Sequence, residues 1–247
     1  MKKIFIFLYQ FYKWLFLLPF FLINSVFFGI IAVILSLFVN QKIGSFVGGV
    51  VWANLNCILT PAFIKIKGRE HIRKHQSYVI IANHQSAYDI LVLYARLGID
   101  FKWVMKKEIR KIPGIGFGSM AVGHIFIDRS STKAALASIN AAKSKIKNGT
   151  SVVFFPEGTR SRVHEMLPFK KGAFRFAFDL NLPILPVTIN GTKAILPSGS
   201  TRLLPGKVEI LIHPPIDIRN YSEQNIQDLM NIARKSIGEG LKPYIDI

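Results

Sequence analysis

The first forty residues limit the possible folds of this chain more than any other part of it. From Ile4 to Val39 the side chains are almost all aliphatic or aromatic. A helix that is apolar all round belongs in a membrane or in the core of a large protein. The run is too long for the apolar region of a signal peptide, and no small-residue cleavage site follows, so we expect it to stay attached. The sequence therefore predicts an N-terminal membrane anchor.

Three arrangements of this anchor are compatible with the sequence. A single helix over 14–39 would be long enough to span a bilayer, which takes about 20 apolar residues. Alternatively, Asn24 and Ser25 form a turn between two helices, each about 22 Å long and too short to cross the hydrocarbon. Such a hairpin would enter one leaflet and return the N-terminal lysines and Lys42 to one side, which the positive-inside rule favours. The third arrangement is a buried hairpin in the core of a soluble protein.

From about residue 61 onward, short β-branched runs alternate with helical patterns. The expected strands lie at 63–68, 77–82, 101–105, 123–129, 151–155, 182–189 and 207–212, and the expected helices at 90–97, 132–147, 168–180 and 222–238. Such alternation predicts an α/β fold with a mixed, largely parallel sheet covered by helices on both faces. We divide the chain into an anchoring segment, 1–60, which includes a packing or interfacial helix over 42–60, and a second domain, 61–247.

The net charge narrows the possible partners. The formal net charge is +18, which favours anionic partners such as phospholipid headgroups, phosphorylated substrates, an acidic carrier protein or nucleic acid.

Cys57 is the single cysteine, so an intramolecular disulfide and a cysteine-rich metal site are excluded. The histidines have no metal-ligand spacing, and we expect neither a metal nor a cofactor. A glycine-rich loop at 113–118 lacks the pattern of a nucleotide-binding loop.

A histidine and an aspartate stand five residues apart between the expected strand 77–82 and the helix that follows. Residues five apart on one helix point about 140° away from each other, so contact requires His84 in the loop and Asp89 in the first helical turns. Asp89 could then accept a hydrogen bond from one imidazole nitrogen and leave the other free as a base. Further polar motifs follow the strands that end near 128 and 156. We expect all three to share one cleft at a sheet edge.

Four blocks in this order resemble the glycerolipid acyltransferase superfamily, and most closely the 1-acyl-sn-glycerol-3-phosphate (lysophosphatidic acid) acyltransferases. The blocks are Asn-His-Gln-Ser-Ala-Tyr-Asp at 83–89, Gly-His-Ile-Phe-Ile-Asp-Arg at 123–129, Phe-Pro-Glu-Gly-Thr-Arg-Ser at 155–161 and Leu-Pro-Ile-Leu-Pro-Val at 182–187. The connecting stretches at 106–116 and 168–174 also look like these enzymes, so the resemblance covers roughly residues 61 to 215. It implies a glycerol-3-phosphate acyltransferase-like fold and makes 61–247 the catalytic domain.

The resemblance implies two catalytic residues. His84 matches the family's general base, and Asp89 matches the residue that orients it, so that the substrate hydroxyl is the nucleophile and no acyl-enzyme forms. Cys57 lies outside the motifs, and Ser86 suits the cap of the following helix better than a nucleophile.

The same resemblance implies the residues that bind the acceptor. Glu157, Gly158, Thr159 and Arg160 match the acceptor-binding block. Arg129 matches a second arginine near the phosphate, with Lys106 a further candidate. An arginine fork suits a phosphate, whereas Glu157 could instead pair with Arg160 and hold the loop.

The function implied is transfer of an acyl chain from an acyl-CoA or acyl carrier protein (acyl-ACP) thioester to the sn-2 hydroxyl of lysophosphatidic acid, which yields phosphatidic acid for phospholipid biosynthesis. The partners are then membrane phospholipids, the acceptor and the donor, with no nucleic acid. We expect the enzyme at a bacterial inner membrane with its catalytic domain on the cytoplasmic face. Alternatives are another lysophospholipid or lyso-aminolipid acceptor, or a basic, membrane-anchored binding protein without activity.

Overall fold

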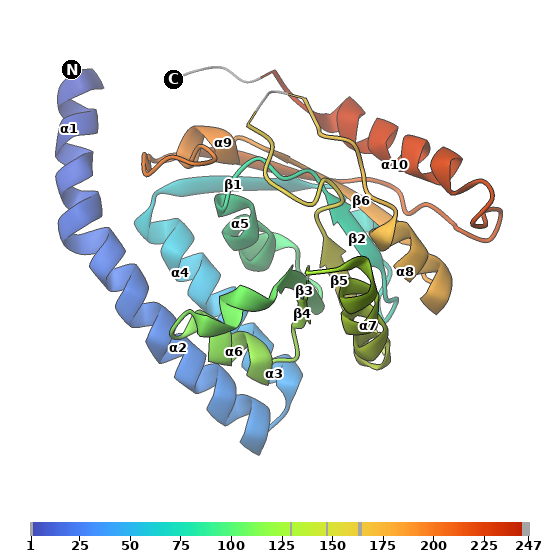
Figure 1. Cartoon of the computed structure of the whole chain (residues 1–247). Coiled ribbons are helices and arrows are strands. Elements are labelled where there is room, and N and C mark those ends of the chain that lie inside the picture. The colour runs from blue at the N-terminus through green and yellow to red at the C-terminus, as the bar shows by residue number, and fades with distance from the viewer. Residues whose placement is uncertain (1, 129, 147, 163–164, 244–247) are drawn as a thin grey trace.

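A central β-sheet organises the structure, a computed structural model that describes residues 2–128, 130–146, 148–162 and 165–243 (Figure 1). In the described residues the sheet has the strand order β1-β7-β6-β2-β5-β3-β4. The strands are β1 (Ala62–Lys67), β2 (Val79–Ala82), β3 (Phe101–Lys106), β4 (Ile125–Ile127), β5 (Ser151–Phe154), β6 (Ile184–Asn190) and β7 (Gly206–Ile212). Neighbouring strands are parallel except β6 and β7, which are antiparallel. The predicted mixed, largely parallel sheet is confirmed.

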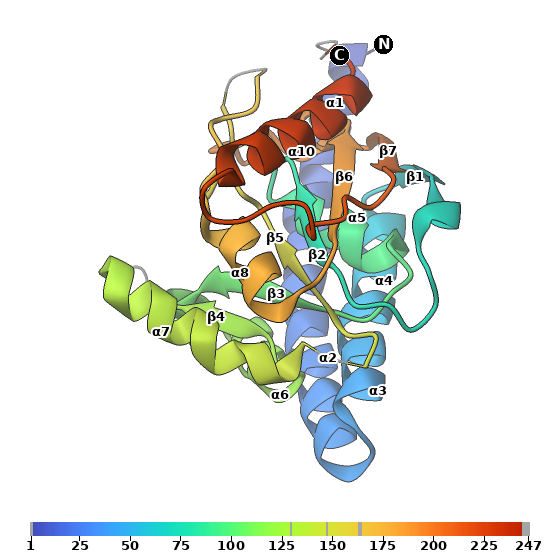
Figure 2. The ribbon, with the colours of Figure 1, turned by 90° about the vertical axis from the view of Figure 1, so that its right-hand side faces the viewer.

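Helices cover both faces of the sheet, as predicted (Figure 2). One face carries α4 (Trp52–Leu59), α5 (Tyr88–Arg96) and α9 (Thr192–Ile195), and the other carries α7 (Thr132–Ala142), α8 (Gly172–Leu180) and α10 (Ile226–Gly240). The strand β2 contributes to a hydrophobic core on each face. Ile80 packs in the core beneath α4, α5 and α9, Val79 and Ile81 pack in the core beneath α7, α8 and α10, and all three are fully buried. Burial on both faces explains why this strand is apolar at every position.

The N-terminal segment is a helical hairpin, but its turn is not where the sequence suggested. One continuous helix comprises α1 (Lys2–Tyr12), a π-helical stretch (Lys13–Leu17) and α2 (Leu18–Phe38). The chain turns at Val39 and Asn40 and returns through α3 (Gln41–Ser45), a second π-helical stretch (Phe46–Val51) and α4 (Figure 1). The Asn40 side chain accepts a hydrogen bond from the Ile43 amide at 2.9 Å and caps the returning helix.

Of the arrangements left open by the sequence, the turn at Asn24 and Ser25 is wrong: both residues lie within α2, and their side chains find partners on the returning helix. The amides of Asn24 and Asn56 exchange two hydrogen bonds of 3.2 Å. Ser25 Oγ donates to the Phe21 carbonyl at 2.6 Å and accepts from Trp52 Nε1 at 3.1 Å. Polar residues that would otherwise favour a turn therefore join the two helices of the hairpin.

The glycine-rich stretch is also more ordered than the predicted loop. A 3₁₀ turn (Lys107–Lys111) precedes it, and its second half begins α6 (Ile115–Ala121), which packs against α2. A Cβ on Gly29 would lie 2.4 Å from the Gly114 carbonyl oxygen, and one on Gly118 would lie 3.0 Å from the Gly29 Cα. Small residues on both sides therefore let the two backbones touch.

Two helices begin later than predicted. Residues 168–171 form a loop, because the Lys170 amide donates to the Pro156 carbonyl at 2.8 Å, and α8 begins only at Gly172. Before α10, the Ser222 amide donates to the side chain of Asn225 at 2.6 Å, which gives a turn where helix was expected.

The outer face of the hairpin is apolar and open. By length and composition Ile4–Phe38 and Gln41–Leu59 could each cross a membrane. Many large apolar side chains of the first helix are more than half exposed, among them Phe7 at 62%, Leu15 at 64% and Ile23 at 69%. An exposed apolar surface of this extent indicates association with a membrane.

Replacing Gly29 with alanine should destabilise the protein. Alanine would gain about 1 kcal/mol of helix propensity, but its methyl would overlap the Gly114 backbone, and overpacking of this kind costs about 1–3 kcal/mol. We expect a lower melting temperature in detergent, measured by circular dichroism. Ile30→Ala, on the open face next to it, is the control; a Gly29→Ala protein as stable as that control would contradict this packing.

Polar substitutions on the open face should weaken membrane binding. The variant Phe7→Asn/Leu15→Asn/Ile23→Asn should partition less into liposomes in flotation assays, because each change removes apolar area that enters the lipid. The control is Ile232→Asn, an exposed apolar residue on α10. Equal partitioning of the two variants would rule out this face as the anchor.

Candidate active site

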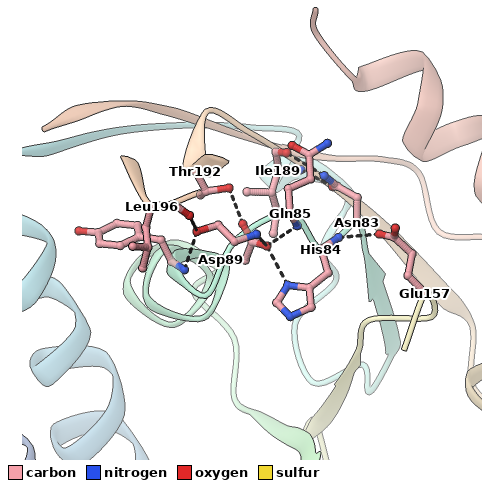
Figure 3. A network of polar contacts seen from close by, with 10 residues as sticks. Asn83, His84, Gln85, Asp89, Glu157, Ile189, Thr192 and Leu196 are labelled. Carbon is pink, nitrogen blue, oxygen red and sulfur yellow. Dashed lines mark hydrogen bonds and ion pairs between the residues drawn. The ribbon is translucent and has the colours of Figure 1, made fainter. Parts of the chain in front are cut away.

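Residues predicted to act together meet where β2 and β5 end. These strands are adjacent and parallel, so the loops that follow them leave the sheet at the same edge. The first loop carries His84 and leads into α5, and the second begins with Phe155 and Pro156 and continues through Glu157 (Figure 3). Asn83 anchors the first loop: its amide accepts from the Ile189 N–H at 2.7 Å and donates to the Ile189 carbonyl at 2.9 Å.

His84 and Asp89 are in direct contact, as predicted. His84 Nδ1 lies 2.8 Å from Asp89 Oδ2, with His84 in the loop and Asp89 in the first turn of α5. The same oxygen accepts hydrogen bonds from the amides of Gln85 and Ser86, each at 2.9 Å, and Oδ1 accepts from the Thr192 hydroxyl at 2.5 Å. An ionised carboxylate only accepts, so Nδ1 carries the proton and Nε2 is left with a free lone pair.

One further contact holds the imidazole ring, and two hold the backbone of His84. Its ring stacks on Phe155, with centroids 3.8 Å apart and an angle of 10° between the planes. The His84 amide donates to Glu157 Oε1 at 2.7 Å, and the His84 carbonyl accepts from the Ser161 amide at 2.7 Å. The Asp89 hydrogen bond and the Phe155 stacking therefore orient the ring, while the backbone contacts position the loop that carries it.

Glu157 contacts backbone amides, not Arg160. Its side chain is buried, and its second oxygen accepts from the Leu167 amide at 2.8 Å. Burial raises the pKa of the Glu157 carboxyl, and the two amide hydrogen bonds partly oppose that rise. Of the two roles considered from the sequence, the described contacts favour holding the loop.

Most of the residues predicted to bind the acceptor line one cavity. Gly158, Thr159 and Arg160 line one cavity with His84 and Lys106, and Arg160 and Lys106 are exposed. Gly158 has a φ of +74°, which a glycine adopts without strain. Arg129 lies outside the described residues.

The sequence analysis missed Lys170, which lines this cavity too. A Cβ on Gly158 would lie 2.9 Å from Lys170 Nζ, so the lysine side chain passes directly over the glycine. The block at 168–174 resembles the same enzymes, and its first lysine was the available signal.

The cavity is large and mostly apolar. It has a volume of about 1110 Å³ and extends from His84 to the N-terminal hairpin. The hairpin contributes Leu17, Leu18, Phe21, Ser25, Gly29, Ala32, Gly48, Gly49, Trp52, Asn56 and Thr60 to its wall. Such a cavity suits an acyl chain.

Three other side chains that could react or bind a ligand are hydrogen-bonded or buried within the fold. Ser86 Oγ donates to the Leu196 carbonyl at 2.6 Å and accepts from the Tyr88 amide at 3.0 Å, which agrees with a cap. Cys57 is buried in α4. His124 is buried against Tyr94 and the Trp103 amide, as expected for a packing residue, and burial holds its pKa well below the usual range. The described residues contain no group of three potential metal ligands.

Comparison with known proteins is consistent with this geometry. Residues 63–190 match the acyltransferase family. A 1-acyl-sn-glycerol-3-phosphate acyltransferase of Chlamydomonas reinhardtii is 34% identical over 79% of this chain and 58% of its own length, and one of Limnanthes douglasii is 34% identical over 85% and 75%. The chain spans about half the length of the algal and chloroplast relatives.

A solved structure has the same fold. The crystal structure of the 1-acyl-sn-glycerophosphate acyltransferase of Thermotoga maritima superposes with a TM-score of 0.79 at 27% identity, over 97% of this chain and 96% of that one.

The family match includes all four sequence blocks and covers more than half of the chain. Both the fold and the relatives agree with it. This chain belongs to the acyltransferase family.

Proposed function

We propose that this protein transfers an acyl chain from an acyl-CoA or acyl-ACP thioester to the sn-2 hydroxyl of 1-acyl-sn-glycerol-3-phosphate, which yields phosphatidic acid. The observation that carries the proposal is the His84–Asp89 pair, 2.8 Å apart, with His84 in the wall of a large, mostly apolar cavity. The names of the relatives support the choice of acceptor.

The chemistry needs one base and no enzyme nucleophile. Nε2 of His84 takes the proton of the acceptor hydroxyl as its oxygen attacks the thioester carbonyl. The tetrahedral intermediate collapses, the C–S bond breaks, and the imidazolium returns the proton to the departing thiolate. Asp89, fixed by four hydrogen bonds, keeps Nδ1 protonated and stabilises the imidazolium between the two steps.

We assign phosphate binding to the exposed cations that line the cavity. Arg160 and Lys106 line the cavity with His84 and make no salt bridge to any described carboxylate. Arg129 remains a candidate from the sequence. Glu157, with both oxygens bonded to backbone amides, would act by holding the His84 loop.

The hairpin would hold the cavity and the His84 site at the membrane surface. A continuous helix over residues 2–38 is about 55 Å long, well beyond the roughly 30 Å hydrocarbon core, and α2 packs on α6 of the catalytic domain. We place the hairpin along one leaflet because this keeps the basic residues at its two ends on the same side of the membrane; its outer face is then toward lipid and its inner face lines the cavity. The cytoplasmic face of a bacterial inner membrane is the location we propose.

His84→Ala should abolish transfer while the protein stays folded, and Asp89→Asn should lower kcat by about 100-fold to 10,000-fold, as expected for loss of general base catalysis. The assay follows phosphatidic acid formation in liposomes with acyl-CoA and acyl-ACP donors. The exposed His75 provides the control variant His75→Asn, since asparagine tolerates its positive φ. Undiminished turnover by His84→Ala would refute the mechanism.

Arg160→Gln should raise the KM for lysophosphatidic acid by about tenfold to 100-fold, the usual effect of losing a charge-assisted hydrogen bond, while the donor KM changes little. Arg162→Gln, two residues along the loop, is the control. A panel of lysophospholipid and lyso-aminolipid acceptors tests the alternative substrates in the same assay. If another acceptor is used better by wild type, the proposed acceptor is wrong.

A further inference from the structure

Lys170 lies against the loop that carries Glu157 and Arg160, a place that the sequence analysis did not assign to it. Its backbone amide donates to the Pro156 carbonyl at 2.8 Å, which ties the loop before α8 to the loop that carries Glu157 and Arg160. The position of its backbone is therefore set by the candidate site itself.

The Lys170 side chain extends across Gly158. A Cβ built on that glycine would lie 2.9 Å from both Cε and Nζ of the lysine. Any larger residue at 158 would displace the ammonium group. The absence of a side chain there thus leaves room for the cation as well as permitting the positive φ.

The cations that line the cavity differ in what they already contact. Among the described residues they are Lys106, Arg160, Lys170 and Arg175. Arg175 is held by Glu223, with 3.0 Å between Nε and Oε1. The other three make no salt bridge within the described chain. Lys106, Arg160 and Lys170 therefore line the cavity without a salt bridge to any described carboxylate, and Lys170 and Arg160 belong to the two loops joined at Pro156.

Three unpaired cations suit a doubly charged anion better than a singly charged one. A phosphate monoester carries about −1.5 to −2 charges at pH 7 because its second pKa is about 6, whereas a phosphodiester carries one. We propose that Lys170 is a further ligand of the acceptor phosphate and makes the site prefer a monoester lysolipid over a diester. This inference rests on the proposed function for the identity of the acceptor.

The test compares Lys170→Met with Lys171→Met, the adjacent lysine, which is exposed and does not line the cavity. With wild type alongside, kcat and KM are measured for lysophosphatidic acid and for lysophosphatidylglycerol, a diester. We expect Lys170→Met to raise the KM for lysophosphatidic acid by about tenfold or more and to reduce the preference for the monoester by a similar factor, with the donor KM unchanged. Lys170→Arg should restore most of the preference.

Binding, measured without turnover, separates this inference from the proposed function. Isothermal titration in detergent should show weaker binding of lysophosphatidic acid to Lys170→Met than to Lys171→Met, with a larger difference at pH 8 than at pH 5, where the monoester is singly charged. That result would support the role of Lys170 even if no acyl transfer were found. An unchanged preference, or equal losses in the two methionine variants, would overturn it.

Discussion

The carboxylate of Asp89 is the interaction on which the rest of the site depends. It is fully buried and accepts hydrogen bonds from the His84 ring, from two amides of the same loop and from Thr192 at the start of α9 (Figure 3). A buried carboxylate without such donors would cost several kcal/mol. Here it joins the β2–α5 loop to the segment after β6, so the orientation of the His84 ring and the packing of the fold are stabilised by the same contacts.

The second buried carboxylate, Glu157, is also held by hydrogen bonds, and this leaves nearby cations without a carboxylate partner among the described residues. Both oxygens of Glu157 accept hydrogen bonds from backbone amides, and no described lysine or arginine forms a salt bridge with Glu157 or Asp89. Since neither carboxylate takes a cationic partner other than the histidine itself, Lys106, Arg160 and Lys170 stay available to an external anion. An overall charge of +18 would not by itself produce such a site; the local pairing does.

Features that depend on neighbours in sequence were predictable, and those that depend on distant partners were not. The contact of His84 with Asp89 follows from strand, loop and helix succeeding one another within a few residues. Asn24 was misread because Asn56, its partner, lies 32 positions away. Glu157 was ambiguous because its partners are backbone amides, which leave no signature in a sequence. Lys170 was overlooked because its place over Gly158 depends on how two loops meet.

The boundary predicted at residue 60 separates segments of chain that share one cavity. Leu17, Phe21 and Gly29 of the long helix line that cavity on its inner side, while Phe7, Leu15 and Ile23 face outward and are exposed. Without the hairpin the apolar cavity would lose a wall and open to water, and its acyl-binding surface would be hydrated. In the proposed function the hairpin is therefore both the part that contacts lipid and a wall of the substrate cavity. This arrangement would let an acyl chain pass between bilayer and active site without crossing water, which spares the cost of exposing its apolar surface.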